Sequence, residues 1–292
     1  MTDKRRDLRA RLASGPIVTA PGAYDGIGAR LIEQAGFPAV YMTGAGTSLS
    51  KGYPDYGLLT LTEMAENAGV LARSITIPVI SDADTGYGNE LNVTRTVREF
   101  ESRGVAAIHI EDQVSPKRCG HLDGKEVISR EAFISKIRAA VAARRDPDFL
   151  IIARTDANAV IGFEEAIARA NAAFEVGADL AFVEAPKTLE EVAAIPSQVR
   201  GPCLLNVVPG GRTPRVELSE AESLGFRLAI YPGACLGPTI LAIDAALARL
   251  KGETPAVDRA GGGPMEVFRR FGADEWDALR HEFDSTPAAT SR

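Results

Sequence analysis

Residues 77–88 read Ile77-Pro78-Val79-Ile80-Ser81-Asp82-Ala83-Asp84-Thr85-Gly86-Tyr87-Gly88, an apolar run that leads directly into two carboxylates and then into glycines. The run is typical of a buried β-strand, and alternate residues of an extended chain lie on the same side. If the extended geometry continues, Asp82 and Asp84 point together from the carboxyl end of the strand. Two roles fit this arrangement: the pair binds a cation, or it caps the next helix and forms turns before the glycines.

Seven further apolar runs of this kind occur along the chain. Each stops at Gly, Pro or a polar residue, as strands buried on both faces do. The eight strands that we predict are Ile17–Ala20, Ala39–Met42, Pro78–Ser81, Ala106–Ile110, Phe149–Ala153, Leu180–Val183, Pro202–Leu205 and Leu228–Tyr231.

Helical patterns separate these runs. Val93, Val97 and Phe100 recur at the helical period, for example. Eight strands that alternate with helices in a chain of 292 residues predict an α/β fold, the (β/α)8 TIM-type barrel. A doubly wound sheet is the alternative, but no Gly-x-Gly-x-x-Gly follows the first strand. Capping-box spacings that open helices occur at Thr60 with Glu63, Thr188 with Glu191 and Ser219 with Glu222.

Polar residues stand at or just past the carboxyl ends of most of these strands. A barrel carries its chemistry on that rim, so the pattern predicts one active site there. Each residue alone could equally be a structural cap. The residues are Thr43, Asp82, Glu111, Arg154, Glu184, Asn206 and Tyr231.

A thiol stands in the segment that follows the fourth predicted strand, Glu111-Asp112-Gln113-Val114-Ser115-Pro116-Lys117-Arg118-Cys119-Gly120-His121. Cationic neighbours lower the pKa of a cysteine, and a loop beside glycine leaves the sulfur accessible. We therefore expect Cys119 to be reactive, although a lone cysteine is more often a small buried apolar residue. Asp82, Asp84, Glu111 and Asp55 are hard oxygen ligands without a second histidine nearby, which favours Mg²⁺ or Mn²⁺ over zinc.

Composition narrows the classes of partner and compartment. A net charge of -6 argues against a nucleic-acid partner, because phosphate binding requires a basic face. The three cysteines lack metal-site spacing and are odd in number, which favours a reducing compartment, the cytoplasm. The charged start of the chain precedes no apolar run, so we expect neither a signal peptide nor a membrane span.

The pattern changes after Lys251. We expect residues 1–251 to form the barrel and residues 252–292 to form a linker, an amphipathic helix and a disordered tail after Asp284. The aromatic residues of that helix, which include Phe268 and Trp276, need a partner surface. That surface is either the base of the same barrel or a neighbouring subunit.

From about Ile17 to Lys251 the sequence resembles the isocitrate lyase and phosphoenolpyruvate mutase superfamily. The segments that carry the resemblance are Ser81–Asn89, Glu111–Gln113, Lys117–His121 and Ala153–Asp156. The resemblance implies a barrel whose terminal helix is exchanged between subunits of a homotetramer. It also implies Mg²⁺ held by Asp82 and Asp84, with Asp55 and Glu111 acting through water. It suggests that Thr43, Gly44 and Ala45 hold a substrate carboxylate and that Arg154 pairs with substrate oxygens. We also expect Gly120, Glu184 and Asn206 to be substrate-binding residues.

Within that superfamily the lyases carry Lys-x-Cys-Gly-His, so Cys119 favours carbon–carbon cleavage. Methylisocitrate lyases carry an arginine where our ungapped reading places Gly237, and they lack the double glycine of Asn206–Pro214. Both features resemble the 2,3-dimethylmalate and 2-alkylmalate lyases, including the petal-death type. Without the arginine a third substrate carboxylate would be buried unpaired, at a cost of several kcal/mol, so a dicarboxylate is favoured. Arg212 or Arg215 could compensate.

The expected reaction is a Mg²⁺-dependent retro-Claisen cleavage of a 2-hydroxy dicarboxylate to a keto acid and a carboxylate. We expect Cys119 to protonate the released enolate, with Lys117 and His121 orienting its loop, and Tyr41 to be a candidate base. Arg154 would bind the keto-acid carboxylate. The alternatives are a methylisocitrate lyase, an oxaloacetate hydrolase or decarboxylase, a phosphonomutase, and, in another class, a non-catalytic metabolite-binding barrel.

Overall fold

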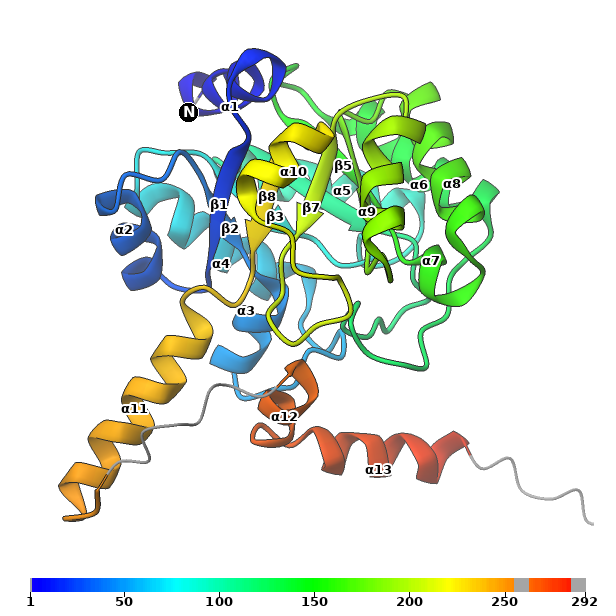
Figure 1. Cartoon of the computed structure of the whole chain (residues 1–292). Coiled ribbons are helices and arrows are strands. Elements are labelled where there is room, and N and C mark those ends of the chain that lie inside the picture. The colour runs from blue at the N-terminus through cyan, green and yellow to red at the C-terminus, as the bar shows by residue number, and fades with distance from the viewer. Residues whose placement is uncertain (1, 255–262, 285–292) are drawn as a thin grey trace, which may run out of the picture.

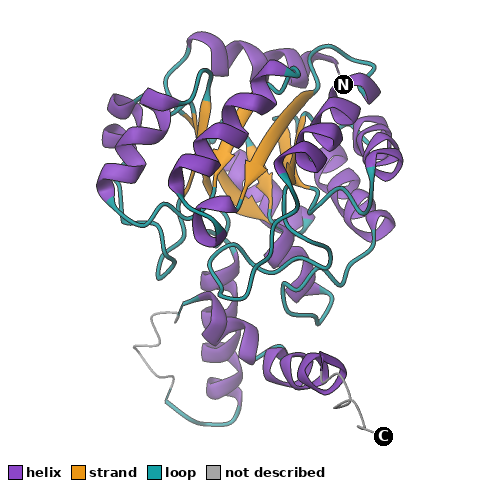
Figure 2. Ribbon diagram, turned by 90° about the vertical axis from the view of Figure 1, so that its right-hand side faces the viewer, coloured by secondary structure: helices purple, strands orange, loops and turns teal. Residues whose placement is uncertain are grey.

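The structure, a computed structural model, describes residues 2–254 and 263–284. Eight parallel strands close into a barrel in sequence order, with β8 hydrogen-bonded to β1, and the helices surround it (Figures 1 and 2). The predicted (β/α)8 barrel is therefore confirmed. The strands are β1 (Val18–Ala23), β2 (Val40–Met42), β3 (Val79–Asp82), β4 (Ala107–Glu111), β5 (Leu150–Thr155), β6 (Leu180–Val183), β7 (Cys203–Asn206) and β8 (Leu228–Tyr231).

The helices fill the connections and cover the outside of the barrel. Those that precede β8 are α1 (Thr2–Ser14), α2 (Gly26–Gln34), α3 (Gly44–Ser50), α4 (Leu61–Ser74), α5 (Glu90–Ser102), α6 (Arg130–Ala143), α7 (Ala157–Val160), α8 (Phe163–Glu175), α9 (Leu189–Gln198) and α10 (Leu218–Leu224). Those that follow it are α11 (Leu236–Leu250), α12 (Pro264–Arg269) and α13 (Ala273–Asp284). No helix in the described part of the chain is long and apolar enough to cross a membrane.

The interior of the barrel is a packed apolar core. Ile80, Ile152 and Phe182 belong to it, and Leu8 and Leu12 of α1 join it at the amino ends of the strands. Because side chains fill this end, substrate access is left to the carboxyl end.

The predicted helix starts are confirmed to different degrees. Thr60 and Glu63 form a reciprocal capping box at the start of α4. Thr188 caps α9, but the Glu191 carboxylate accepts from Lys187 N instead of from the cap. The third prediction is wrong, because α10 begins at Leu218, before Ser219.

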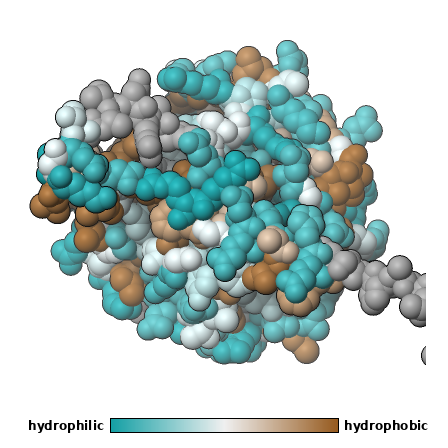
Figure 3. All heavy atoms as spheres, turned by 90° about the horizontal axis from the view of Figure 1, so that it is seen from below, coloured by the Kyte–Doolittle hydropathy of each residue, from teal (hydrophilic) through white to brown (hydrophobic). Residues whose placement is uncertain are grey.

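In the structure α11 leaves the barrel; it precedes the terminal helix whose exchange between subunits the resemblance implies. None of its residues is buried within the described chain, and it projects away from the barrel (Figure 1). Leu241, Ile243, Leu247 and Leu250 are exposed along it, and apolar side chains appear on this side of the molecule at the left of Figure 3. An apolar helix of this kind requires a partner surface.

The C-terminal aromatic segment packs at the mouth of the barrel and not at its base. Phe268 of α12 is 2% exposed and packs with Cys119 and Leu122. The alternative that this segment rests on the base of the barrel is therefore wrong. The predicted tail after Asp284 and most of the predicted linker, at residues 255–262, lie outside the described residues.

Candidate active site

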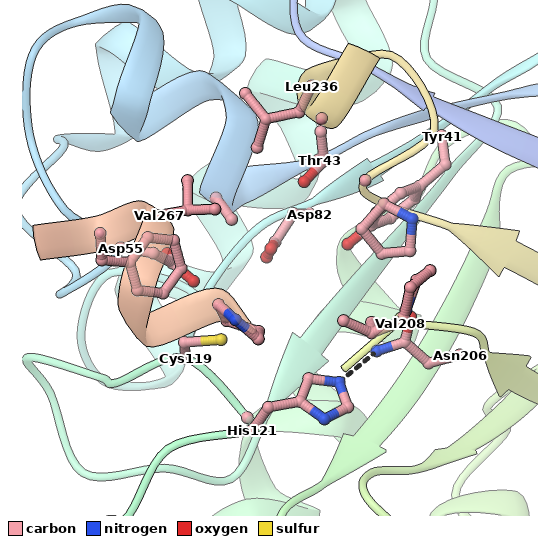
Figure 4. Close-up of a pocket in the computed structure, with 18 of the residues that line it drawn as sticks. Tyr41, Thr43, Asp55, Asp82, Cys119, His121, Asn206, Val208, Leu236 and Val267 are labelled. Atoms are coloured by element: carbon pink, nitrogen blue, oxygen red, sulfur yellow. Dashed lines mark hydrogen bonds between the residues drawn. The ribbon is translucent and has the colours of Figure 1, made fainter. Parts of the chain in front are cut away.

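A cavity of about 330 Å³ opens at the carboxyl ends of the strands, the size of a site for a small ligand. It brings together side chains that are far apart in sequence, and Figure 4 shows Asp82 near the centre of the view with Cys119, His121 and Asn206 below it. The predicted residues that line it are Tyr41, Thr43, Ala45, Asp55, Asp82, Cys119, Gly120, His121, Arg154, Glu184 and Asn206. Four predicted residues lie behind this lining: Gly44, Asp84, Glu111 and Lys117. The predicted site residue Tyr231 instead lines a groove on the outside of the barrel.

The two carboxylates of the opening motif approach each other by a turn, not by strand geometry. β3 ends at Asp82, and Asp84 has a φ of 45°, in the left-handed region. Asp84 N donates to Asp82 Oδ1 at 2.9 Å. The prediction that an extended strand places both carboxylates on one side is therefore wrong. A turn brings Asp82 and Asp84 together instead. Aspartate tolerates the left-handed conformation better than most residues.

The carboxylates around this turn fit a hard divalent cation. Burial, together with the charges of Asp82 and Asp55, raises the pKa of Asp84 to about 6, against the opposing effect of Lys117. Burial also raises the pKa of Glu111 well above its usual value, and both Glu111 oxygens are buried without a hydrogen bond from any described residue, although Arg154 Nη1 lies 3.1 Å from Oε2. Such oxygens need a positive charge, and oxygen ligands are those that Mg²⁺ and Mn²⁺ prefer.

Lys117 supplies part of that charge. Its Nζ lies 2.5 Å from Asp55 Oδ1 and 3.0 Å from Asp84 Oδ1, and these carboxylates raise its pKa despite burial. Within residues 2–254 and 263–284, no three acidic, histidine or cysteine side chains converge as a finished metal site. The structure thus shows carboxylates that are suited to binding a metal ion, with the Lys117 ammonium group placed between two of them.

Arg154 on β5 is surrounded by three carboxylates. Its Nε lies 3.0 Å from Asp156 Oδ2, its Nη1 3.1 Å from Glu111 Oε2, and its Nη2 3.4 Å from Glu184 Oε2. The guanidinium also lies over the Phe182 ring, 5.0 Å from its centroid. Glu184 is therefore not a helix cap; the cap of α9 is Thr188, and Glu184 Oε2 accepts from Asn206 Nδ2 at 3.0 Å.

The surroundings of Cys119 differ from those expected. Lys117 pairs with carboxylates, and Arg118 pairs with Asp277 of α13 at 2.6 Å. The thiol is 8% exposed and packs with Tyr56 and Phe268, so burial raises its pKa to about 12. The predicted lowering of the thiol pKa is therefore wrong. A thiol that stays protonated is suited to donating a proton.

His121 is held in one tautomer. Its Nδ1 accepts from Arg212 N at 3.0 Å, and because a backbone N–H only donates, the ring proton lies on Nε2. Nε2 then points to Glu184 Oε1 at 3.6 Å, and Asn206 Nδ2 lies 3.4 Å from the same nitrogen, the contact drawn as a dashed line in Figure 4. Burial lowers the pKa of His121, which favours this neutral form.

Tyr41 is buried beside His109. Its hydroxyl lies 2.9 Å from His109 Nε2, and the rings stack with centroids 5.8 Å apart. Burial, then the charge of Asp82, raises the Tyr41 pKa well above 10, which argues against a phenolate base. Burial lowers the pKa of His109 to about 4, and its side chain lies fully buried in the core of the barrel.

Two glycines allow the close approach of backbone to charged side chains. A Cβ at Gly44 would lie 2.3 Å from Asp82 Oδ2, and one at Gly120 would lie 2.5 Å from Arg154 Nη2. Thr43 is the N-cap of α3, so the first N–H groups of that helix, at Gly44 and Ala45, have no acceptor within the helix. These groups are suited to a substrate carboxylate.

Sequence reasoning missed Lys125. Its Nζ is buried and lies 2.7 Å from Asp156 Oδ1, the carboxylate that also holds Arg154. The only signal in the sequence was its place four residues after His121, in the same loop.

A family model described as phosphoenolpyruvate phosphomutase matches residues 8–251. The chain is 50% identical over 230 residues to 2,3-dimethylmalate lyase of Eubacterium barkeri, covering 78% of this chain and 80% of that protein. It is 48% identical over 225 residues to 2-methylisocitrate lyase of Aeropyrum pernix, covering 77% and 72%. A solved structure of oxaloacetate acetylhydrolase with 3,3-difluorooxalacetate superposes with a TM-score of 0.84 at 38% identity, covering 98% of this chain and 99% of that one. The chain belongs to the phosphoenolpyruvate mutase/isocitrate lyase superfamily.

Proposed function

We propose that the chain is a Mg²⁺-dependent carbon–carbon lyase that cleaves a 2-hydroxy dicarboxylate of the 2,3-dimethylmalate or 2-alkylmalate type into an α-keto acid, such as pyruvate, and a carboxylate. The observation that carries this proposal is the buried Cys119 thiol, whose pKa burial raises to about 12, on the wall of a cavity whose other described lining residues include one arginine and an apolar side. The similarity to 2,3-dimethylmalate lyase supports it.

Different residues of the cavity bind the substrate, accept its hydroxyl proton and protonate the product. Arg154 and the first N–H groups of α3 bind the carboxylate that stays with the keto acid, and neutral Tyr41 hydrogen-bonds the substrate hydroxyl. The carboxylates at the floor of the cavity are the groups able to accept the hydroxyl proton. When the carbon–carbon bond breaks, the departing carboxylate becomes an enolate, and the Cys119 thiol protonates its carbon.

The metal would be held by Asp82 and Asp84, with Asp55 and Glu111 acting through water. When bound, Mg²⁺ supplies positive charge to the oxygen that becomes the keto group. Lys117 would then shift its contacts among the same carboxylates, because two cations cannot share one position. We propose Mg²⁺ before Mn²⁺.

The wall of the cavity favours a dicarboxylate. Among the described residues that line it, Arg154 is the one permanent cation, and the side of the cavity toward α11 is formed by aliphatic residues that include Leu236 and Ile240. Gly237 lines the cavity and its missing Cβ would meet open space. Neither Arg212, which pairs with Asp123, nor Arg215, which pairs with Glu217, is among the described residues that line the cavity, which supports a dicarboxylate. Apolar walls suit the alkyl groups of an alkylmalate.

Keto-acid release tests the proposal. In the presence of Mg²⁺ we expect pyruvate from 2,3-dimethylmalate, and from a 2-alkylmalate the 2-oxo acid that keeps its alkyl group, both detected by reduction with lactate dehydrogenase. We expect a kcat/KM for 2-methylisocitrate at least about 100-fold lower, the discrimination that one unpaired buried charge provides. The Gly237→Arg variant, which places a guanidinium in the open space, should narrow this ratio. Turnover of methylisocitrate alone by the unaltered protein would contradict the dicarboxylate assignment.

A second candidate is oxaloacetate hydrolysis. The close superposition of the oxaloacetate acetylhydrolase structure over nearly the whole chain favours it. It predicts release of oxalate and acetate from oxaloacetate, which the same preparations can be assayed for. Oxalate release without turnover of any malate derivative would favour this candidate over the lyase.

We propose that residues 1–251 form the catalytic unit, that residues 252–292 extend it, and that α11 is exchanged between subunits of a homotetramer. A groove on the outside of the barrel, lined by Leu31, Phe37 and Tyr231 among others, offers α11 of a second copy an apolar surface. The free thiols of the chain suit the cytoplasm, where we place it.

Charge substitutions on α11 should break this assembly. We expect a Leu247→Glu, Leu250→Glu double variant to lower the mass in light scattering to that of smaller species, because both side chains are exposed within one chain and would be buried between two. Leu91→Glu on α5 is the matched control, since Leu91 is 78% exposed and lies away from α11. A mass unchanged by the α11 variant would exclude the exchange.

A further inference from the structure

The loop that carries Cys119 has a short paired stem. Gln113 and Val127 form an antiparallel bridge, Val114 N donates to Glu126 O at 2.9 Å, and Ile128 N donates to Asp112 O at 2.9 Å. Residues 114–126 therefore leave the barrel and return to it at one place. The stem fixes the ends of the loop but leaves its far portion, where the thiol stands, to other contacts.

The peptide on the amino side of Cys119 is held by the side chain of Gln113. Gln113 Nε2 donates to Arg118 O at 2.9 Å, and Arg118 N donates to Gln113 Oε1 at 2.9 Å. Gln113 is 1% exposed, so both bonds are shielded from water. A pair of reciprocal bonds to one residue fixes the orientation of its backbone as well as its distance.

The peptide on the carboxyl side is held by Lys125. Its Nζ donates to Gly120 O at 2.5 Å and pairs with Asp156 Oδ1 at 2.7 Å. Asp156 in turn bonds Arg154 through Nε and Nη2. Lys125 thus connects the backbone next to the thiol with the side chain that we assign to the substrate carboxylate.

We propose that Gln113 and Lys125 are positioning residues that brace Cys119 from both sides and set its thiol against the substrate that Arg154 binds. The inference rests on the proposed function, in which the thiol delivers a proton to carbon. Proton transfer to carbon requires the donor within a few tenths of an ångström of its productive place, and a loop without such bonds does not provide this. All three bonds from Gln113 and Lys125 to the loop are made to backbone atoms, so they fix the path of the loop whatever side chains flank Cys119.

The test combines turnover with the reactivity of Cys119 itself. Gln113→Met and Lys125→Met keep the length of each side chain and remove the bonds. In the full-length protein with Mg²⁺, we expect iodoacetamide to alkylate Cys119 about tenfold faster in either variant, as read from the Cys119 peptide by mass spectrometry. We expect kcat to fall about 10- to 100-fold, the effect of losing one or two buried hydrogen bonds. KM should change less than kcat in Gln113→Met, because Gln113 does not touch the partners of Arg154.

Lys4→Met is the matched control. Lys4 Nζ donates to the backbone oxygens of Ala72 and Ile75, so this variant removes an equivalent ammonium group away from the cavity. It should leave the alkylation rate and kcat unchanged. Lys125→Arg, which keeps the charge, should restore part of the lost kcat and part of the protection of Cys119 from alkylation. In the Gln113→Met, Lys125→Met double variant, kcat should fall by a factor smaller than the product of the two single-variant factors, because both residues act on one loop segment.

Alkylation and kcat in Gln113→Met and Lys125→Met that match the Lys4→Met control would overturn the proposal. If Lys125→Met does not fold, Gln113→Met alone decides the matter, since its bonds are made within the loop. Absence of turnover in the unaltered protein would count against the lyase assignment, whereas the alkylation rates would still decide whether the brace exists.

Discussion

Replacing Cys119 by serine is expected to lower kcat for the malate derivative by about 1,000-fold, within the range for loss of a general acid. A hydroxyl has the shape of a thiol but is a much weaker acid, so the enolate would find no donor in its place. KM should change little, because Cys119 stands at the edge of the cavity and makes no ion pair in the described chain. Steady-state rates for the two proteins measure the effect.

The pH profile separates a donor thiol from a thiolate. Burial raises the Cys119 pKa to about 12, so the group is protonated throughout the neutral range. A donor of this kind gives no loss of kcat from its own ionisation up to about pH 9, whereas a required thiolate would make kcat rise with pH. Cys235→Ser, at the start of α11, is the matched control and should keep full kcat. A Cys119→Ser protein with near-normal turnover would place the proton donor elsewhere.

The fold was predictable because parallel strands buried on both faces produce short apolar runs. All eight predicted strands are present, and the errors concern their ends. β1 continues to Ala23 rather than Ala20, and Asp82, Glu111 and Arg154 are the last or nearly the last residues of strands rather than residues beyond them. Strand pairing continues while hydrogen-bond partners are available, and hydrophobicity does not report that.

The members of the site were predictable, but their partners were not. Placing polar residues on one rim required only the order of the strands, and the cavity collects most of them. Which charge faces which depends on loop contacts that span the chain, such as Lys117 with Asp55 and Arg118 with Asp277. Those contacts pair both cations with carboxylates, and burial of the thiol outweighs the remaining effect of Lys117, so the sign of the pKa shift of Cys119 was predicted wrongly.

The departure of α11 shows a similar limit. Its sequence pattern is that of an ordinary barrel helix, with an apolar residue about every third or fourth position. Such a pattern shows that the helix needs a surface, but it does not show which copy of the chain provides it.

Replacing Arg154 by methionine is expected to lower the free energy of unfolding by about 3–5 kcal/mol and to abolish turnover. Arg154 is 5% exposed and pairs with Glu111, Asp156 and Glu184, so the substitution leaves buried carboxylates without their shared cation. Urea unfolding without added metal measures the loss. The pH dependence has a definite sign: burial is the largest single effect and raises the Asp156 pKa, but the charges and hydrogen bonds of Arg154 and Lys125 together hold that pKa below its usual value. The stability gained from that charge is complete above the usual carboxylate pKa of about 4 and is lost as the pH falls, so the two proteins should converge in acid.

Two further variants distinguish the buried charge cluster from a general effect of removing arginine. Arg200 pairs with Glu175 where both side chains are largely exposed, so Arg200→Met should cost less than about 1 kcal/mol at any pH. Arg154→Lys keeps the charge but loses the planar fork that reaches three carboxylates, and it should recover much of the stability and little of the turnover. Equal stability losses in Arg154→Met and Arg200→Met would mean that the carboxylates do not depend on Arg154. Full turnover in Arg154→Lys would mean that the substrate carboxylate needs only a positive charge and not a bidentate partner.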